Sequence, residues 1–100
     1  MEDLLDEARK IINEVDTQMA ELFVRRMRAA EMVFAYKKEK GLPILDQARE
    51  AVVIEQNTRR IQDENLKGYY VDFLQNVMAL SRAYQQQMQN DLCESQGETP

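Results

Sequence analysis

A long stretch without glycine or proline is the feature that most constrains how this chain folds. From Glu2 to Lys40 neither residue occurs, and the stretch is rich in Leu, Ala, Met, Arg, Lys and Glu, which all favour helices. Apolar side chains recur there at alternating steps of four and three, which places them on one side of a helix. This row consists of Ala8, Ile12, Val15, Met19, Leu22, Ala29, Val33 and Tyr36, with Arg26 at one of its positions. The pattern predicts one helix over about residues 3–39, which the Gly-Leu-Pro sequence at 41–43 ends.

Two shorter helices are expected after this break, so the predicted fold class is all-α with three helices per chain. The first begins near Asp46, a good N-cap residue, and frays near residues 63–66. The second begins around residues 67–68 and carries apolar residues three and four apart. The polar segment 91–100 shows no period and is expected to be a flexible tail or the start of a linker, which leaves residues 1–90 as one domain.

The lengths of the predicted helices imply a partner for the first one. At about 1.5 Å per residue the first helix is roughly 55 Å long, and the other two are roughly 27 and 35 Å. Helices of these lengths cannot cover the apolar row of the first unless they lie end to end, and an uncovered apolar row requires a partner. The simplest arrangement is a homodimer in which the long helices pair.

The composition excludes much of the usual side-chain chemistry. There is no His, which removes the usual general base and the commonest metal ligand. Cys93 is the only cysteine, so neither an intrachain disulfide nor a multi-cysteine zinc site can form. The net charge of −5 argues against nucleic acid as a partner. No apolar run approaches the roughly 18 residues that span a bilayer, and the acidic N-terminus is unlike a signal or transit peptide, so we expect a cytoplasmic protein. Any catalysis is expected to rely on Arg, Lys, Glu, Asp, Ser and Gln side chains without a metal ion.

Arg26 and Lys37 are the first candidates for a binding site. Arg26 occupies a position of the apolar row, where a guanidinium is costly to bury without a partner. Lys37 lies only about 20° further round the helix and roughly 16 Å along it, so the two positive charges share one line. The alternative is structural, because long stems of this kind also snorkel past a neighbouring helix to reach water.

Two further clusters place polar groups beside these apolar rows. Ser81 and Gln85, at i, i+4 spacing, end the apolar row of the expected helix that begins around residues 67–68. Asp46, Arg49 and Glu50 lie at the start of the expected helix that begins near Asp46. Structural alternatives exist for both clusters. In the first, Ser81 bonds its own i−4 carbonyl and Gln85 lies at a polar helix end; in the second, Asp46 caps a helix beside a surface ion pair.

Taken together, the three clusters predict an enclosed cationic pocket with hydrogen-bond donors and one carboxylate. Such a pocket suits a small polyanion. A dicarboxylate fits best, because each guanidinium group binds a carboxylate through two parallel hydrogen bonds.

The order of these residues resembles the all-helical class of chorismate mutases, of the bacterial three-helix type. The similarity covers about residues 4–89. Arg9 opens a segment similar to the family's R-x-x-I-x-x-x-D, which ends here at Asp16, and Arg26 lies in a segment similar to L-x-x-R-R. Lys37, in Ala-Tyr-Lys-Lys, matches the next basic position of the family.

Two more motifs complete the resemblance. Residues 42–50, Leu-Pro-Ile-Leu-Asp-Gln-Ala-Arg-Glu, are similar to the most specific motif of the family, P-[IV]-x-D-x-x-R-E. Ser81 and Gln85 match the closing S-x-x-x-Q. All the motifs occur in the family's order and at its spacings, which makes the combined resemblance strong.

The resemblance implies an intertwined homodimer with two active sites. It also implies an isomerase that converts chorismate to prephenate by a Claisen rearrangement, on the route to Phe and Tyr, without cofactor or metal. Arg9 and Arg26 would hold the two substrate carboxylates, with Ser81 assisting one of them. Lys37 and Gln85 would donate hydrogen bonds to the ether oxygen of the breaking bond.

The remaining roles concern the ring hydroxyl and the second subunit. By the same resemblance, Glu50 and the backbone near Asp46 hold the ring hydroxyl, and Arg49 supports that end. Helix geometry adds an independent constraint, because Arg9 and Arg26 lie roughly 25 Å apart along one helix. A ligand less than about 10 Å across cannot contact both in one chain. We therefore expect Arg9 to reach the partner's site across a two-fold axis.

Three alternatives to this function stay open at this point. An isochorismate pyruvate lyase shares the fold and a similar cationic pocket. A non-catalytic dimeric helical adaptor needs the apolar row but has no use for the polar clusters. A regulatory mutase-like domain keeps the ligand-binding residues but acts by binding another enzyme.

Overall fold

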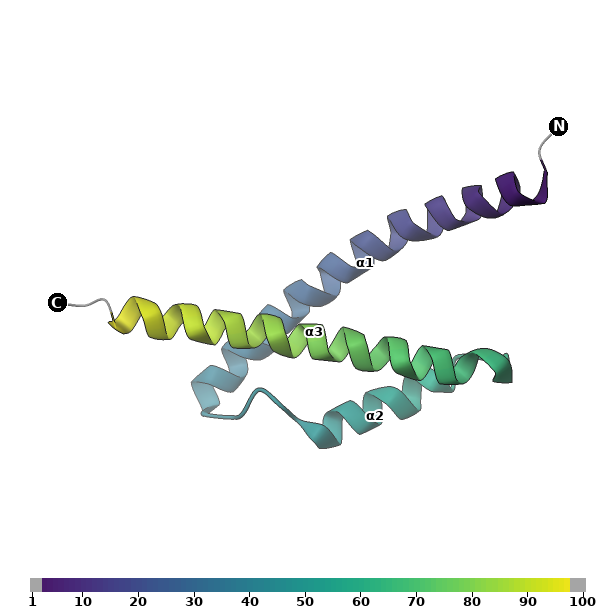
Figure 1. Ribbon diagram of the computed structural model, residues 1–100. Coiled ribbons are helices and arrows are strands. Elements are labelled where there is room, and N and C mark those ends of the chain that lie inside the picture. Colours follow the sequence, from purple (N-terminus) through teal and green to yellow (C-terminus); the bar gives the residue numbers. More distant parts are fainter. Residues whose placement is uncertain (1–2, 98–100) are drawn as a thin grey trace.

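The computed structural model of the protein describes residues 3–97, and this part of the chain folds into three helices without a strand (Figure 1). They are α1 (Leu4–Lys40), α2 (Gln47–Thr58) and α3 (Glu64–Gly97). The C-terminal half of α1 crosses α3, and α2 packs along the N-terminal half of α3. The N-terminal half of α1 projects away from the other two helices.

The boundaries of α1 agree closely with those expected from the sequence, because both ends carry capping residues. The Asp3 carboxylate accepts a hydrogen bond from the backbone N–H of Asp6 at 2.9 Å, which satisfies one free donor of the first turn. At the other end Gly41 adopts a left-handed conformation with φ of 68°. Its N–H and that of Leu42 bond the carbonyls of Lys38 and Lys37, which closes the last turn.

The start of α2 is confirmed at Asp46, but the helix ends earlier than expected. The Asp46 carboxylate accepts from the backbone N–H of Arg49 at 3.0 Å, so it is the N-cap. The last helical residue is Thr58 rather than one near 63–66. The Asp63 side chain then accepts from the N–H of Asn65 at 2.9 Å, and this local capping bond starts α3 several residues before the expected position.

The third helix is much longer than the sequence pattern predicts. α3 has 34 residues, α1 has 37 and α2 has 12, so the expected single long helix with two shorter ones is wrong. Side chains four residues apart bond one another in the polar part of α3: Gln86 with Asn90, Gln87 with Asp91, and Gln89 with Cys93. Because these bonds support a helix in water without apolar periodicity, the helix continues through residues 91–97.

The expectation of a flexible tail over residues 91–100 is therefore wrong for residues 91–97, which are helical. Residues 98–100 lie outside the described part of the chain. The division of the chain at residue 90 stays a prediction. Among the described residues, none of the helices combines the length and the apolar character that crossing a bilayer requires.

The core of the described chain is small and lies where α1 meets α3. Its buried apolar side chains are Ala30, Phe34, Leu74 and Met78. The radius of gyration is 18.2 Å, against about 13 Å for a compact domain of this length. The exposed apolar side chains of the N-terminal half of α1 are Leu4, Leu5, Ile11, Ile12, Val15, Met19, Leu22, Phe23 and Val24. The other two helices therefore leave this half of the apolar row uncovered.

Candidate functional site

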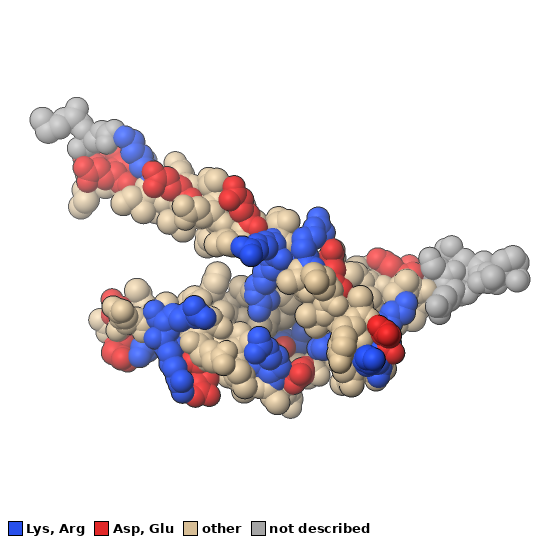
Figure 2. Space-filling view, turned by 180° about the vertical axis from the view of Figure 1, so that it is seen from behind, with Lys and Arg blue, Asp and Glu red and all other residues tan. Residues whose placement is uncertain are grey.

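A cavity of about 300 Å³ lies between the C-terminal half of α1, the α1–α2 loop, α2 and α3. This volume is at the lower end of the range for small-molecule sites. In Figure 2, basic side chains gather in the middle of the molecule, where α1 crosses the other helices. The lining residues are Arg26, Ala29, Ala30, Val33, Lys37, Ile44, Asp46, Arg49, Glu50, Val53, Met78, Ser81, Arg82 and Gln85.

The structure brings all the predicted site residues together at this cavity except Arg9. Arg9 is exposed in the projecting half of α1, one of the regions that contribute nothing to the lining. Its distance from Arg26 along the helix is roughly 25 Å, as the helix rise requires. The site of a single chain therefore lacks one of the two arginines expected to hold the ligand.

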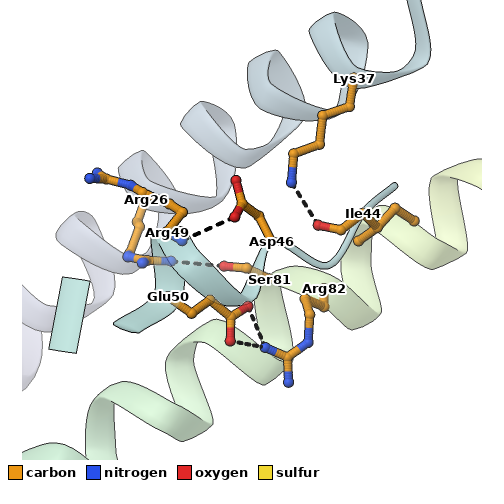
Figure 3. A network of polar contacts seen from close by, with 8 residues as sticks. All are labelled: Arg26, Lys37, Ile44, Asp46, Arg49, Glu50, Ser81 and Arg82. Carbon is orange, nitrogen blue, oxygen red and sulfur yellow. Dashed lines mark hydrogen bonds and ion pairs between the residues drawn. The ribbon is translucent and has the colours of Figure 1, made fainter. Parts of the chain in front are cut away.

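Two cations of α1 reach across to neighbouring segments (Figure 3). Arg26 donates from Nη1 to the Ser81 hydroxyl at 2.8 Å, which links α1 to α3. Lys37 donates from Nζ to the backbone carbonyl of Ile44 at 2.6 Å, which ties the α1–α2 loop to α1. Both side chains thus line the cavity, although Arg26 is exposed and Lys37 is half-buried.

The polar groups of α3 are buried at the cavity wall. Ser81 is 7% exposed and Gln85 is 5% exposed, so Gln85 does not lie at a polar helix surface. The Oε1 atom of Gln85 is buried and makes no hydrogen bond. A buried polar atom left in this state costs about 1–3 kcal/mol. A 180° turn of the terminal amide exchanges its carbonyl and NH2 groups, so Gln85 can present either an acceptor or a donor to a bound molecule.

The acidic side chains of α2 have two different partners. Asp46 is occupied in capping the helix, as described above. Glu50 accepts from Arg82 Nη1 of α3 on both carboxylate oxygens, each at 2.5 Å (Figure 3). The sequence analysis did not single out Arg82. The available signal was its position four residues after Met78, which places it on the same side of α3 as a core residue.

The balance of charge around the cavity favours an anionic ligand. Four cationic and two anionic side chains line it, an excess of two positive charges in a chain whose net charge is −5. Such a local excess attracts a dianion and holds it in a partly desolvated space. Within residues 3–97 there is no cluster of three or more His, Cys, Asp or Glu side chains suited to holding a metal ion.

A second polar cluster joins α1 and α3 outside the cavity lining. Tyr84 donates its hydroxyl to the Glu31 carboxylate at 2.5 Å, and Arg28 donates to the same oxygen at 2.7 Å. These bonds lower the pKa of Glu31 from its ordinary value, with the hydrogen bond from Tyr84 as the first cause. The same bond raises the pKa of Tyr84. The cluster is therefore a charged link between the two long helices.

The comparison with protein families points to the same part of the molecule. The family model described as chorismate mutase type II matches residues 8–86, a range that includes Arg9 and every residue lining the cavity. No curated protein and no solved structure matches the chain. An all-helical fold and a match over most of the sequence lead to one conclusion: the chain belongs to the chorismate mutase type II family.

Proposed function

We propose that the protein is a chorismate mutase, an isomerase that converts chorismate to prephenate by a Claisen rearrangement. The observation that carries the proposal is the cavity at which Arg26, Lys37, Ser81 and Gln85 meet from two helices. Membership of the chorismate mutase type II family supports the choice of substrate. A role in Phe and Tyr synthesis, in the cytoplasm, is part of the same proposal.

The rearrangement suits the residues that line the cavity. It is unimolecular and requires no general base, nucleophile, metal or cofactor. The protein accelerates it by holding the compact chair-like conformer of the substrate, which lowers the entropic part of the barrier. It also places fixed hydrogen-bond donors where negative charge develops on the ether oxygen. A chain without His can perform both tasks.

The proposed roles of the α1 and α3 residues follow from their positions. Arg26, already bonded to Ser81, holds one substrate carboxylate. Lys37 and Gln85 donate to the ether oxygen as the C–O bond breaks. An ammonium group has three donors, so Lys37 can keep its bond to the Ile44 carbonyl while it binds this oxygen.

The proposed roles at the α2 end concern the ring hydroxyl. Glu50 accepts a hydrogen bond from this group, and the backbone near Asp46 contributes a second contact. Arg49 supports this end of the site through the capped first turn of α2. Asp46, Arg49 and Glu50 are thereby matched to the part of the substrate that does not react.

A homodimer completes the proposed site. The exposed apolar row on the N-terminal half of α1 needs a cover, and a second copy of the same row in antiparallel orientation supplies one. This pairing brings the N-terminal part of one long helix near the middle of the other. Arg9 of the partner subunit then holds the second substrate carboxylate, and each of the two sites is composite.

Incubation of the purified chain with chorismate and, separately, with isochorismate tests the proposed activity. We expect chorismate absorbance to decrease and prephenate to form. Salicylate and pyruvate from isochorismate, without prephenate from chorismate, identify a lyase on the same fold instead. No turnover of either compound by a dimeric, folded protein contradicts an enzymatic function and favours a regulatory binding domain.

A further inference from the structure

Arg82 is the charged residue at the cavity that has no role in the function proposed above. It follows Ser81 on α3 and contacts Glu50 on α2, so its ion pair joins two helices. Other ion pairs of the described chain, such as Arg59 with Glu55, connect neighbouring turns of one helix. The Arg82 and Glu50 side chains are 34% and 25% exposed, and both line the cavity.

The geometry of this pair defines what Arg82 can do for Glu50. One guanidinium nitrogen, Nη1, donates to both carboxylate oxygens, each at 2.5 Å, and holds the carboxylate in one orientation. An ionised carboxylate has about four lone-pair positions, so two contacts leave it able to accept a further hydrogen bond. A pair that is partly open to solvent contributes little to folding stability, but it restricts the rotamers of both side chains.

The charge of Arg82 also matters for an anionic ligand. Arg82 offsets the charge of Glu50, so the excess of two positive side chains at the cavity comes from Arg26, Lys37 and Arg49 against Asp46. The ion pair also holds the Glu50 carboxylate in one orientation. Arg49, which we propose supports this end of the site, contributes its backbone N–H to the cap at Asp46.

We propose that Arg82 is a positioning residue, which holds the Glu50 carboxylate where it accepts a hydrogen bond from the hydroxyl group of the bound dicarboxylate. The inference rests on the proposed function and extends it. Arg82 itself does not touch the reacting atoms. Its contribution therefore passes through Glu50 and disappears when either Glu50 or the ligand hydroxyl is removed.

A double-mutant cycle tests this route. We expect Arg82→Met to lower kcat/KM for chorismate about tenfold, as the loss of one oriented, charge-assisted hydrogen bond predicts. Arg82→Lys keeps the charge and restores part of this loss. In the Glu50→Gln background, Arg82→Met should change kcat/KM by less than about twofold, because coupled residues do not contribute additively.

Two controls separate positioning from a general structural role. Arg59→Met breaks a comparable but exposed arginine–glutamate pair away from the cavity and should leave kcat/KM unchanged. With a chorismate analogue that lacks the ring hydroxyl, Arg82→Met and the wild type should have equal kcat/KM. Far-UV circular dichroism of each variant checks that the helices remain. If Arg82→Met does not fold, Arg82→Lys replaces it in the double-mutant cycle with Glu50→Gln.

Several results would overturn the inference. Additive losses in the double mutant show that Arg82 acts independently of Glu50. An equal loss on the analogue without the hydroxyl shows that hydroxyl recognition is not involved. An active wild type with an equally active Arg82→Met contradicts the inference alone, whereas a wild type inactive on chorismate contradicts the proposed function and the inference with it.

Discussion

The two halves of α1 have the same sequence periodicity but different surroundings. In the C-terminal half, Ala30 and Phe34 are buried against α3, and Arg26 and Lys37 bond neighbouring segments at the cavity. In the N-terminal half, over residues 4–25, the apolar row is exposed from Ile12 to Leu22. The buried residues Ala30 and Phe34 each follow a member of the row by one position, whereas the row members Val33 and Tyr36 are 45% and 57% exposed. Periodicity therefore predicts the helix, but α3 covers positions next to the predicted row.

This difference separates two tasks along one helix. The C-terminal half provides the cations of the cavity in its own chain. The N-terminal half carries Arg9 and an uncovered apolar row, which in our proposal belong to the dimer and to the site of the partner. Substitutions in the apolar row of the N-terminal half should therefore disrupt the dimer, whereas substitutions in the C-terminal half should impair ligand binding or turnover and leave the dimer intact.

The largest effect is expected from a charge placed in the uncovered row. Ile12 is 54% exposed in the single chain, so Ile12→Asp leaves the monomer fold intact. In a dimer the same carboxylate is buried in an apolar interface, which is prohibitively costly. We expect a monomer with no measurable mutase activity. Light scattering coupled to size-exclusion chromatography measures the oligomeric state, and a fully active dimeric variant contradicts the proposed pairing.

Arg26→Leu tests the cavity half of the same helix. Leu restores the apolar row and removes a cation from a partly exposed position, so we expect an unchanged or higher Tm. The variant keeps the dimer but loses an arginine that holds a carboxylate, and kcat/KM should decrease about 10³-fold. Thermal unfolding and steady-state kinetics check the two effects separately. An unfolded variant indicates instead that Arg26 is needed to hold α1 on α3 through Ser81.

Lys37→Ala should have a more selective effect. Loss of one charge-assisted donor to the ether oxygen lowers kcat by about 10²-fold, with a much smaller change in KM. Steady-state kinetics on chorismate separates these two parameters. A variant with normal kcat and a raised KM would show that Lys37 only attracts the dianion.

The smallest effect is expected at the Glu31–Tyr84 link, which lies outside the cavity lining. Tyr84→Phe should lower Tm by a few degrees at pH 7 and leave kcat unchanged. The pKa of Glu31 is lowered in the folded chain, so its contribution is present above the ordinary glutamate pKa and is lost as the pH falls through the lower folded value. The difference in Tm between wild type and Tyr84→Phe should therefore narrow below about pH 4. A difference that stays constant down to pH 3 contradicts this link.

Much of the fold follows from local features of the sequence. The Gly-free stretch, its apolar row, Gly41 and the caps at Asp46 determine where α1 ends and α2 begins, and both positions are confirmed. The end of α3 was missed, because glutamine and asparagine pairs four residues apart stabilise a helix without an apolar period. Such pairs are visible in a sequence only when polar spacing is read as carefully as apolar spacing.

Some residues of the candidate site could likewise be predicted from the sequence, and others could not. Arg26, Ser81 and Gln85 could be identified because they interrupt apolar rows, and the structure places them at one cavity. Arg82 was missed, because its spacing from Met78 indicates only the side of α3 on which it lies, whereas its partner Glu50 is brought to it by the packing of α2. Contacts within one helix follow from spacing, whereas contacts between helices depend on how the helices cross.

Subunit exchange between two inactive variants tests the central claim most directly, which is that each half of α1 serves a different site. Arg9→Ala and Arg26→Ala are each expected to be inactive as homodimers. After exchange at equal amounts, random pairing makes about half the dimers mixed, and each mixed dimer has one site with both arginines and one with neither. Activity should return to about a quarter of the wild-type value. Verified exchange without recovery of activity contradicts the composite site.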